Sequence, residues 1–116
     1  MPAGVETWPA EISYELDSVL KDLDVAMLLR VQEERMHGGF FPSDREYRAR
    51  YGLTSERLNK MNKNALIMHP GPMIRGHEID YDVADADHTV VLEQVANGVY
   101  LRMAVFFALL SGTNEI

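Results

Sequence analysis

Two short apolar runs interrupt the mixed pattern of hydrophobic and polar residues along this chain. Residues 24–31 read DVAMLLRV and residues 65–68 read ALIM, so both runs are almost free of polar alternation. Such runs, about four to eight residues long, are typical of strands that are buried on both faces, as in a parallel sheet. We therefore predict a core strand at each run, and residues 11–14 indicate a further short strand.

Helical signals occupy much of the remaining chain. Apolar residues recur at helical intervals over 16–23, which predicts a short amphipathic helix. Ser43 is followed three residues later by a glutamate, a capping-box pattern that predicts a helix over 44–52. A threonine begins a similar segment, which predicts a helix over 54–63. Residues 73–87 are acidic and irregular, and we expect loop there.

The longest periodic segment is residues 88–111, which predicts a C-terminal helix. One of its faces carries a stripe of apolar residues: Val91, Leu92, Val95, Val99, Met103, Phe106 and Leu110. Beyond Gly98 the segment is apolar nearly all round. A helix of that kind needs cover on several sides.

The order of these elements, in which strands alternate with helices, is that of a parallel α/β sheet. We therefore predict an α/β fold with an incomplete parallel sheet flanked by helices and a long C-terminal helix. Two or three strands are few for such a sheet, and they cannot cover the apolar surface of the last helix. Either a partner chain completes the fold, or this chain is cut from a longer polypeptide.

Composition narrows the class of protein. The chain has 116 residues, 47% apolar and 25% charged, which are ordinary values for one globular domain. Its net charge of −7 argues against general nucleic-acid binding but leaves room for a small anionic ligand. The absence of cysteine excludes disulfides, thiolate zinc sites and a cysteine nucleophile. Since neither a signal peptide nor a membrane-spanning apolar run is visible, we expect a cytoplasmic protein.

Arg30 lies at the end of the first apolar run, and Gln32 follows two residues later. Ligands of open parallel sheets bind beyond the carboxyl ends of the strands, where both residues are expected. A planar guanidinium there can bind a carboxylate through two parallel hydrogen bonds, and Gln32 projects to the same side as an amide donor. Spacing alone slightly favours the alternative, in which Arg30 only marks the strand end and pairs with a neighbouring glutamate.

The second apolar run ends at His69-Pro70-Gly71-Pro72. Two prolines remove N–H donors and restrict φ, so the carbonyls of Pro70 and Gly71 are aimed in advance at a ligand rich in N–H groups. The alternative is a stiff exit from the strand, in which the glycine supplies backbone freedom. From the residues alone the two interpretations are about even.

Other candidates for chemistry are weaker. Several histidines and aspartates suggest a metal site, but they form no recognised ligand spacing, and we expect no metal. These residues are His69, His77, His88, Asp80, Asp82, Asp85 and Asp87. No pair of nucleophile and base can be drawn. The residues by themselves therefore lead to a site for a small acid, built from Arg30 and the Pro-Gly-Pro carbonyls.

Both candidate motifs belong to a larger pattern. Four pieces in order cover most of the chain: LLRVQEERM (28–36), GGFFPSDREYRARYGL (38–53), HPGPMIRGHEID (69–80) and VLEQVANGVYLRMAV (91–105). With these pieces the sequence resembles the C-terminal, aspartate-binding part of the catalytic chain of aspartate carbamoyltransferase. The combination of the Leu-Arg-Val-Gln and His-Pro-Gly-Pro motifs makes the resemblance specific.

The resemblance implies transfer of the carbamoyl group of carbamoyl phosphate to the amino group of L-aspartate, giving N-carbamoyl-L-aspartate and phosphate in pyrimidine biosynthesis, without a cofactor. By the same likeness Arg30 binds the aspartate carboxylates with Gln32 in support. The main chain of Pro70, Gly71 and Pro72 binds the carbamoyl group. Residues 32–47 resemble the family's mobile loop, which closes over the substrates. The resemblance assigns no catalytic residue within this chain.

The resemblance also implies missing parts. Residues 1–116 correspond to part of the aspartate-binding domain, and helix 88–111 is expected to pack on an absent carbamoyl-phosphate domain that carries a Ser-Thr-Arg-Thr loop. We therefore expect this chain alone to be inactive. The parent is expected to form homotrimers, with regulatory or dihydroorotase chains as possible partners and no nucleic acid or membrane. One alternative is an ornithine-type carbamoyltransferase, although its turn carries a cysteine that is absent here. Another is a non-catalytic, truncated interaction module.

Overall fold

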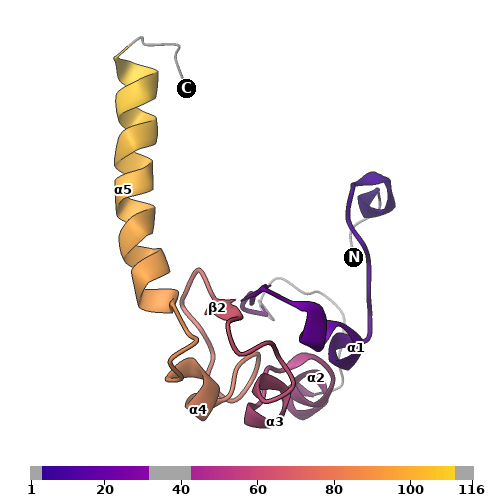
Figure 1. The fold of residues 1–116 in the computed structure, drawn as a ribbon. Coiled ribbons are helices and arrows are strands. Elements are labelled where there is room, and N and C mark those ends of the chain that lie inside the picture. Colours follow the sequence, from indigo (N-terminus) through magenta and orange to yellow (C-terminus); the bar gives the residue numbers. More distant parts are fainter. Residues whose placement is uncertain (1–3, 32–42, 112–116) are drawn as a thin grey trace.

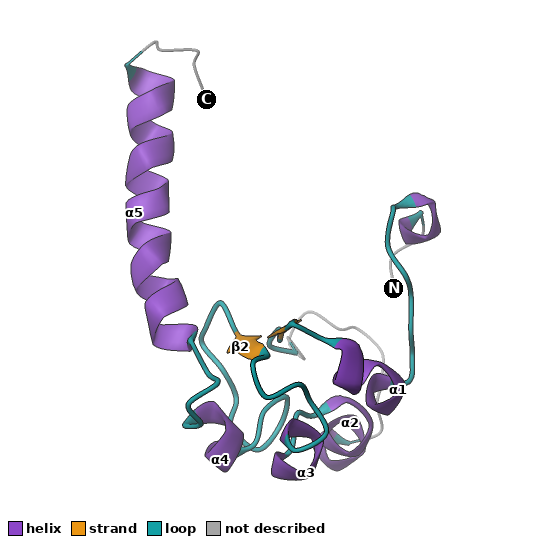
Figure 2. Cartoon of the chain, in the orientation of Figure 1, coloured by secondary structure: helices purple, strands orange, loops and turns teal. Residues whose placement is uncertain are grey.

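The computed structural model describes residues 4–31 and 43–111. In these ranges two short parallel strands are flanked by helices, and a long helix follows them, which confirms the α/β prediction (Figure 1; Figure 2). The elements in chain order are η1 (Val5–Thr7), α1 (Leu16–Val19), η2 (Leu20–Asp22), β1 (Val25–Met27), α2 (Asp44–Tyr51), α3 (Ser55–Leu58), β2 (Leu66–Met68), α4 (Tyr81–Ala84) and α5 (Val91–Leu110).

β1 and β2 pair in parallel, with Ala26 opposite Ile67 at the centre of the register. A third segment lies along the other edge of β2. The Ile67 N–H donates to the His88 carbonyl at 2.8 Å, and the Val90 N–H donates to the Ile67 carbonyl at 3.0 Å. The predicted helix over 88–111 was therefore too long at its start, because its first three residues extend the sheet instead.

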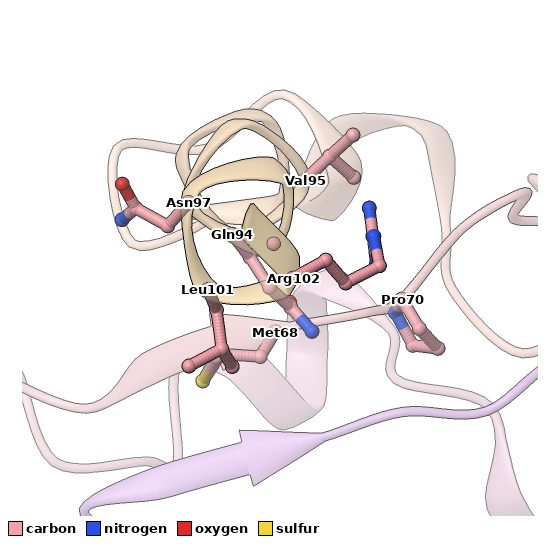
Figure 3. Close-up of a pocket in the computed structure, with 8 residues that line it drawn as sticks. Met68, Pro70, Gln94, Val95, Asn97, Leu101 and Arg102 are labelled. Atoms are coloured by element: carbon pink, nitrogen blue, oxygen red, sulfur yellow. The ribbon is translucent and has the colours of Figure 1, made fainter. Parts of the chain in front are cut away.

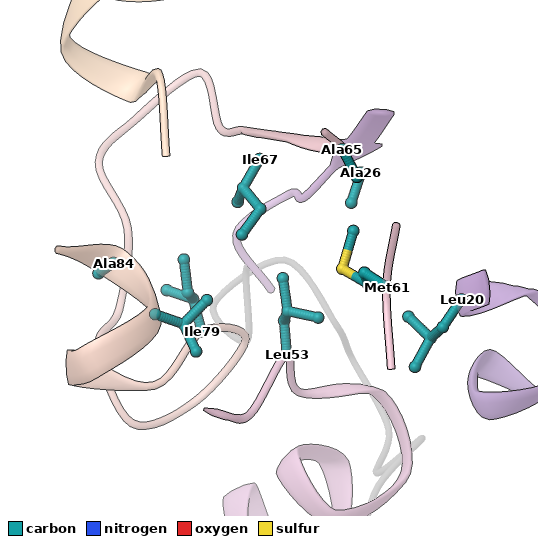
Figure 4. Close-up of a cluster of buried hydrophobic side chains, with 9 residues drawn as sticks. Leu20, Ala26, Leu53, Met61, Ala65, Ile67, Ile79 and Ala84 are labelled. Atoms are coloured by element: carbon teal, nitrogen blue, oxygen red, sulfur yellow. The ribbon is translucent and has the colours of Figure 1, made fainter. Parts of the chain in front are cut away.

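The hydrophobic core lies on one face of this sheet (Figure 4). Its buried members are Leu20, Ala26, Leu53, Met61, Ala65, Ile67, Ile79, Val83 and Ala84. Figure 1 shows α1 to α4 gathered on the same side of the strands. On the opposite face Val25 and Met27 are exposed. The expectation of strands buried on both faces was wrong for the described residues, because this second face remains largely exposed even though Gln94 of α5 contacts Met27 Sδ at 3.7 Å.

The segment 44–52 folds as predicted. The Ser43 hydroxyl accepts a hydrogen bond from the Glu46 N–H at 3.2 Å, so it satisfies one free donor at the start of α2. The helix ends at Gly52, where a Cβ would lie 2.7 Å from the Arg48 carbonyl oxygen and 2.8 Å from that of His77. Glycine is therefore required where the end of α2 packs against the second half of the chain.

Two other expectations were wrong. Residues 11–14 form no strand, and residues 81–84 form the short helix α4 where loop was expected. The predicted helix over 54–63 begins on the Thr54 hydroxyl cap as expected, but α3 ends at Leu58. Short apolar or acidic segments carry weak local signals, so tertiary packing decides their structure.

Arg57, which is buried, ties α3 to two other elements. Its Nη2 donates a hydrogen bond to Asp17 Oδ2 on α1 at 2.7 Å. The guanidinium also donates hydrogen bonds to main-chain carbonyls at the end of α2. The acceptors at the end of α2 are the carbonyls of Arg48, Ala49, Arg50 and Gly52. One side chain thus satisfies several carbonyls that a helix end leaves without partners.

The ion pairs of Asp17 predict a dependence of stability on pH. Hydrogen bonds from Arg57, and then from Lys60, hold the pKa of Asp17 below its ordinary value of 3.8. The unfolded chain therefore binds more protons in this range, so stability is present above about pH 4 and is lost as the pH falls through the folded pKa. The measurement is the free energy of urea unfolding at pH 7 and near pH 3. Asp17→Asn should flatten this dependence.

Asp22→Asn provides the control, since Asp22 is exposed and forms no ion pair with other residues in 4–31 or 43–111. This variant should retain the slope of the unmodified chain. An equal flattening by both substitutions would show that the acid sensitivity arises elsewhere.

α5 extends away from the remaining elements (Figure 1). Only Val91 of this helix is buried, whereas Leu92, Tyr100 and Phe107 are 85%, 69% and 73% exposed. Among residues 4–31 and 43–111, none of the helices combines the length and the apolar character that crossing a bilayer requires.

Candidate functional site

The carboxyl ends of β1 and β2 lie at the same edge of the sheet, because the strands are parallel. The Leu28 N–H extends their pairing by donating to the Met68 carbonyl at 2.9 Å. Met27 lies opposite Met68, so Arg30 (30 − 27 = 3) and Gly71 (71 − 68 = 3) both lie three residues past the same level of the register. The fold thus brings these two predicted site residues to one edge. Gln32 lies outside the described residues.

The turn after β2 has a distinct backbone. Gly71 has a φ of 71°, in the left-handed region that favours glycine, and the Gly71–Pro72 peptide bond is cis. The Gly71 N–H donates to Nδ1 of His69 at 2.9 Å. Within the described part of the chain, the carbonyls of Pro70 and Gly71 accept no hydrogen bond. Both oxygens therefore retain their capacity to bind a donor.

A buried polar network holds this turn in place. His69 is 0% exposed and Glu78 is 2% exposed. His69 Nε2 lies 3.1 Å from Glu78 Oε1, and the same oxygen accepts the Ile74 N–H at 2.6 Å. The His69 N–H donates to the side-chain Oε1 of Gln94 on α5 at 2.8 Å. The turn is therefore held by β2, by the segment around Glu78 and by the first turn of α5.

An open pocket of about 450 Å³ adjoins the turn (Figure 3). It is lined by Met68, Pro70, Gln94, Val95, Asn97, Gly98, Leu101 and Arg102. Arg102 supplies a positive charge here, and it forms no ion pair within residues 4–31 and 43–111. The pocket thus combines a cation, two side-chain amides and an apolar wall next to Pro70, a lining that suits a small polar ligand.

Sequence reasoning missed three residues of this site: Glu78, Gln94 and Arg102. The helical pattern held a signal for two of them, since Gln94, Gly98 and Arg102 recur every four residues and interrupt the apolar surface of one helix. Glu78 carried no such signal. Its role depends on contacts with His69, nine residues earlier, which only the fold reveals.

Two of the histidines considered as metal ligands, His69 and His77, have other partners. His77 is buried and stacks on the ring of Tyr47, with ring centroids 4.8 Å apart, and its Nε2 lies 3.6 Å from Asp44 Oδ1. Across the described part of the chain, no group of three or more His, Cys, Asp or Glu residues is placed to hold a metal ion.

Comparisons with known proteins show the family of this chain. Residues 6–109 match the family model of the aspartate/ornithine carbamoyltransferase Asp/Orn-binding domain. The chain is 61% identical over 114 residues to the aspartate carbamoyltransferase catalytic subunit of Corynebacterium kroppenstedtii, covering 98% of this chain and 36% of that subunit. The chain thus spans about a third of the length of the curated relatives that it matches.

Solved structures show the same fold. The ornithine carbamoyltransferase of Thermus thermophilus superposes with a TM-score of 0.73 at 15% identity, over 94% of this chain and 35% of that one. The aspartate transcarbamoylase of Trypanosoma cruzi, in complex with carbamoyl aspartate and phosphate, superposes with a TM-score of 0.66 at 24% identity, over 79% of this chain and 27% of that one. The chain therefore belongs to the aspartate/ornithine carbamoyltransferase family, and residues 6–109 correspond to the Asp/Orn-binding domain of that family.

Proposed function

We propose that this chain is the aspartate-binding part of an aspartate carbamoyltransferase, which transfers the carbamoyl group of carbamoyl phosphate to L-aspartate. The observation that carries the proposal is the position of Arg30 and Gly71 at one edge of the sheet, three residues past the same register level. Relatives 55–61% identical to the chain are named as aspartate carbamoyltransferase catalytic subunits, which favours aspartate over ornithine.

In this proposal Arg30 binds a carboxylate of aspartate through paired charged hydrogen bonds, and Gln32 supports it. The main chain of Pro70, Gly71 and Pro72 accepts hydrogen bonds from the NH2 of the carbamoyl group. The aspartate amine attacks the carbamoyl carbon, so a C–N bond forms. The C–O bond to phosphate then breaks, phosphate leaves, and the amine loses a proton. The chain contributes by orienting both substrates next to each other.

The exposed surface of α5 supports a second part of the proposal. Apolar side chains surround this helix beyond Gly98, and a helix of that type is stable only under cover. We assign the cover to a carbamoyl-phosphate domain of the same enzyme, which would also hold the phosphate. Residues 1–116 are then a partial aspartate-binding domain of a cytoplasmic homotrimer. Regulatory or dihydroorotase chains are further partners of the whole enzyme in this proposal.

The test is an assay of the full-length enzyme that carries this chain, with carbamoyl phosphate and either L-aspartate or L-ornithine. We expect carbamoyl aspartate from the first amino acid and no product from the second, because Arg30 suits a second carboxylate rather than an amine. The separate 116-residue chain should form no product, because this proposal assigns the phosphate site to the carbamoyl-phosphate domain. Product from ornithine alone would assign the chain to the ornithine carbamoyltransferases. Turnover by the separate chain would contradict the assignment of phosphate binding to another domain.

A further inference from the structure

We infer that Glu78 is a positioning residue that acts through His69 to aim the Pro70 carbonyl into the substrate site. The inference rests on the proposed function, because it concerns the carbonyls assigned to the carbamoyl group. It is carried by a chain of contacts that runs from a buried carboxylate to one peptide unit of the turn.

The first step is the tautomer of His69. The Gly71 N–H lies 2.9 Å from His69 Nδ1, so this nitrogen must offer a lone pair. The neutral ring then carries its hydrogen on Nε2, which faces Glu78 Oε1 at 3.1 Å. Glu78 therefore favours the tautomer in which Nδ1 is an acceptor, and it holds the ring in place.

The second step follows from peptide geometry. The Pro70 carbonyl and the Gly71 N–H belong to the same planar peptide unit, and this unit is trans, so the two groups point in opposite directions. Because the Gly71 N–H is directed at the buried His69 ring, the Pro70 carbonyl is directed away from it. Pro70 also lines the open pocket beside α5, where a ligand can reach it.

The third step concerns the position of the carboxylate. Glu78 is 2% exposed, and a buried carboxylate is costly unless it is hydrogen-bonded. Its Oε1 accepts from both ends of the turn, from His69 Nε2 and from the Ile74 N–H at 2.6 Å. Its Oε2 has no hydrogen-bond partner among the described residues and lies 3.4 Å from His77 Nδ1. One oxygen of Glu78 thus fixes the turn on both sides.

The test compares Glu78→Met with Glu78→Gln in the full-length enzyme. Glutamine retains one oxygen that can accept from both His69 and Ile74, whereas methionine retains the volume and loses both hydrogen bonds. We expect Glu78→Met to raise the KM for carbamoyl phosphate, with a fall in kcat/KM of about tenfold to a hundredfold. Glu78→Gln should stay within about threefold of the unmodified enzyme. Equal KM values for Glu78→Met and the unmodified enzyme, or equal damage by both substitutions, would overturn the inference.

A second pair of variants covers the case in which Glu78→Met does not fold. In His69→Asn the side-chain amide oxygen can lie near the position of Nδ1 and accept from the Gly71 N–H. In His69→Gln the longer side chain places its amide near the position of Nε2, so the Gly71 N–H loses its partner. The inference predicts that His69→Asn retains more activity than His69→Gln. The reverse order would contradict it.

Nitrogen NMR of the histidine rings separates this inference from the proposed function. In the unmodified enzyme His69 should show a proton on Nε2 and none on Nδ1, and Glu78→Gln should preserve this state. If the unmodified enzyme makes no carbamoyl aspartate, the proposed function fails, yet the spectrum still decides whether Glu78 sets the tautomer. A proton on Nδ1 of His69 would exclude the contact with Gly71 and overturn the inference.

Discussion

Replacement of Arg30 by glutamine in the full-length enzyme is expected to lower kcat/KM for L-aspartate by about a hundredfold. Hydrogen bonds between charged groups contribute roughly 1.5–3 kcal/mol each, and a guanidinium forms two of them with one carboxylate. Every 1.4 kcal/mol or so changes an equilibrium about tenfold, so the lower end of this range, about 3 kcal/mol for the pair, corresponds to about two orders of magnitude. Initial rates at varied aspartate and saturating carbamoyl phosphate measure the effect, which should appear mainly in the KM for aspartate.

Arg50→Gln is the matched control. Arg50 is an exposed arginine on α2 whose guanidinium carbon lies 5.6 Å from the centre of the Tyr51 ring, and it has no part in the proposed site. This variant should retain the kinetics of the unmodified enzyme. If Arg30→Gln lowers the melting temperature but leaves the KM for aspartate unchanged, Arg30 serves the strand end through a local ion pair, and the substrate role is wrong.

Truncation of Ile67 to alanine is expected to lower the free energy of unfolding of this chain by about 2–5 kcal/mol. Ile67 is 0% exposed, lies at the centre of the register between β1 and the segment 88–90, and packs against the core of Figure 4. Its removal leaves a cavity between elements that come from both halves of the chain. Urea unfolding followed by circular dichroism measures the change.

Leu66→Ala provides the comparison, because Leu66 precedes Ile67 on the same strand but is 42% exposed on the open face. Its truncation should cost less than about 1 kcal/mol, since little buried surface is lost. If the two variants lose equal stability, the conclusion that only one face of the sheet is buried does not hold for this chain in solution.

The fold could be predicted where the signal was local or continuous. The hydroxyl caps of α2 and α3 bond to N–H groups three residues away, so Ser43 and Thr54 marked both helix starts correctly. The aliphatic run at 65–68 became β2. The first run, 24–31, became a strand of only three residues, because pairing with β2 ends soon after Leu28. Apolar composition alone does not state where such pairing stops.

The candidate site could be predicted only in part. Arg30 and the Pro-Gly-Pro turn were visible because each follows an apolar run, and parallel strands bring their carboxyl ends together. The support for the turn was not visible. The contact of Gln94 with the main chain of His69 spans 25 residues, and the contact of Glu78 with the His69 ring joins two turns that lack a common pattern.

By itself, the sequence determined the helix caps, the two core strands, the family and the two motifs that follow the strands. Each of these depends on neighbours within a few residues, or on motifs that can be compared directly. Only the tertiary structure decided that one face of the sheet is open and that Arg102 lines a pocket beside Pro70. It alone also placed a buried glutamate behind the turn. The reason is that a residue far along the chain can meet the turn only after the strands have set their register.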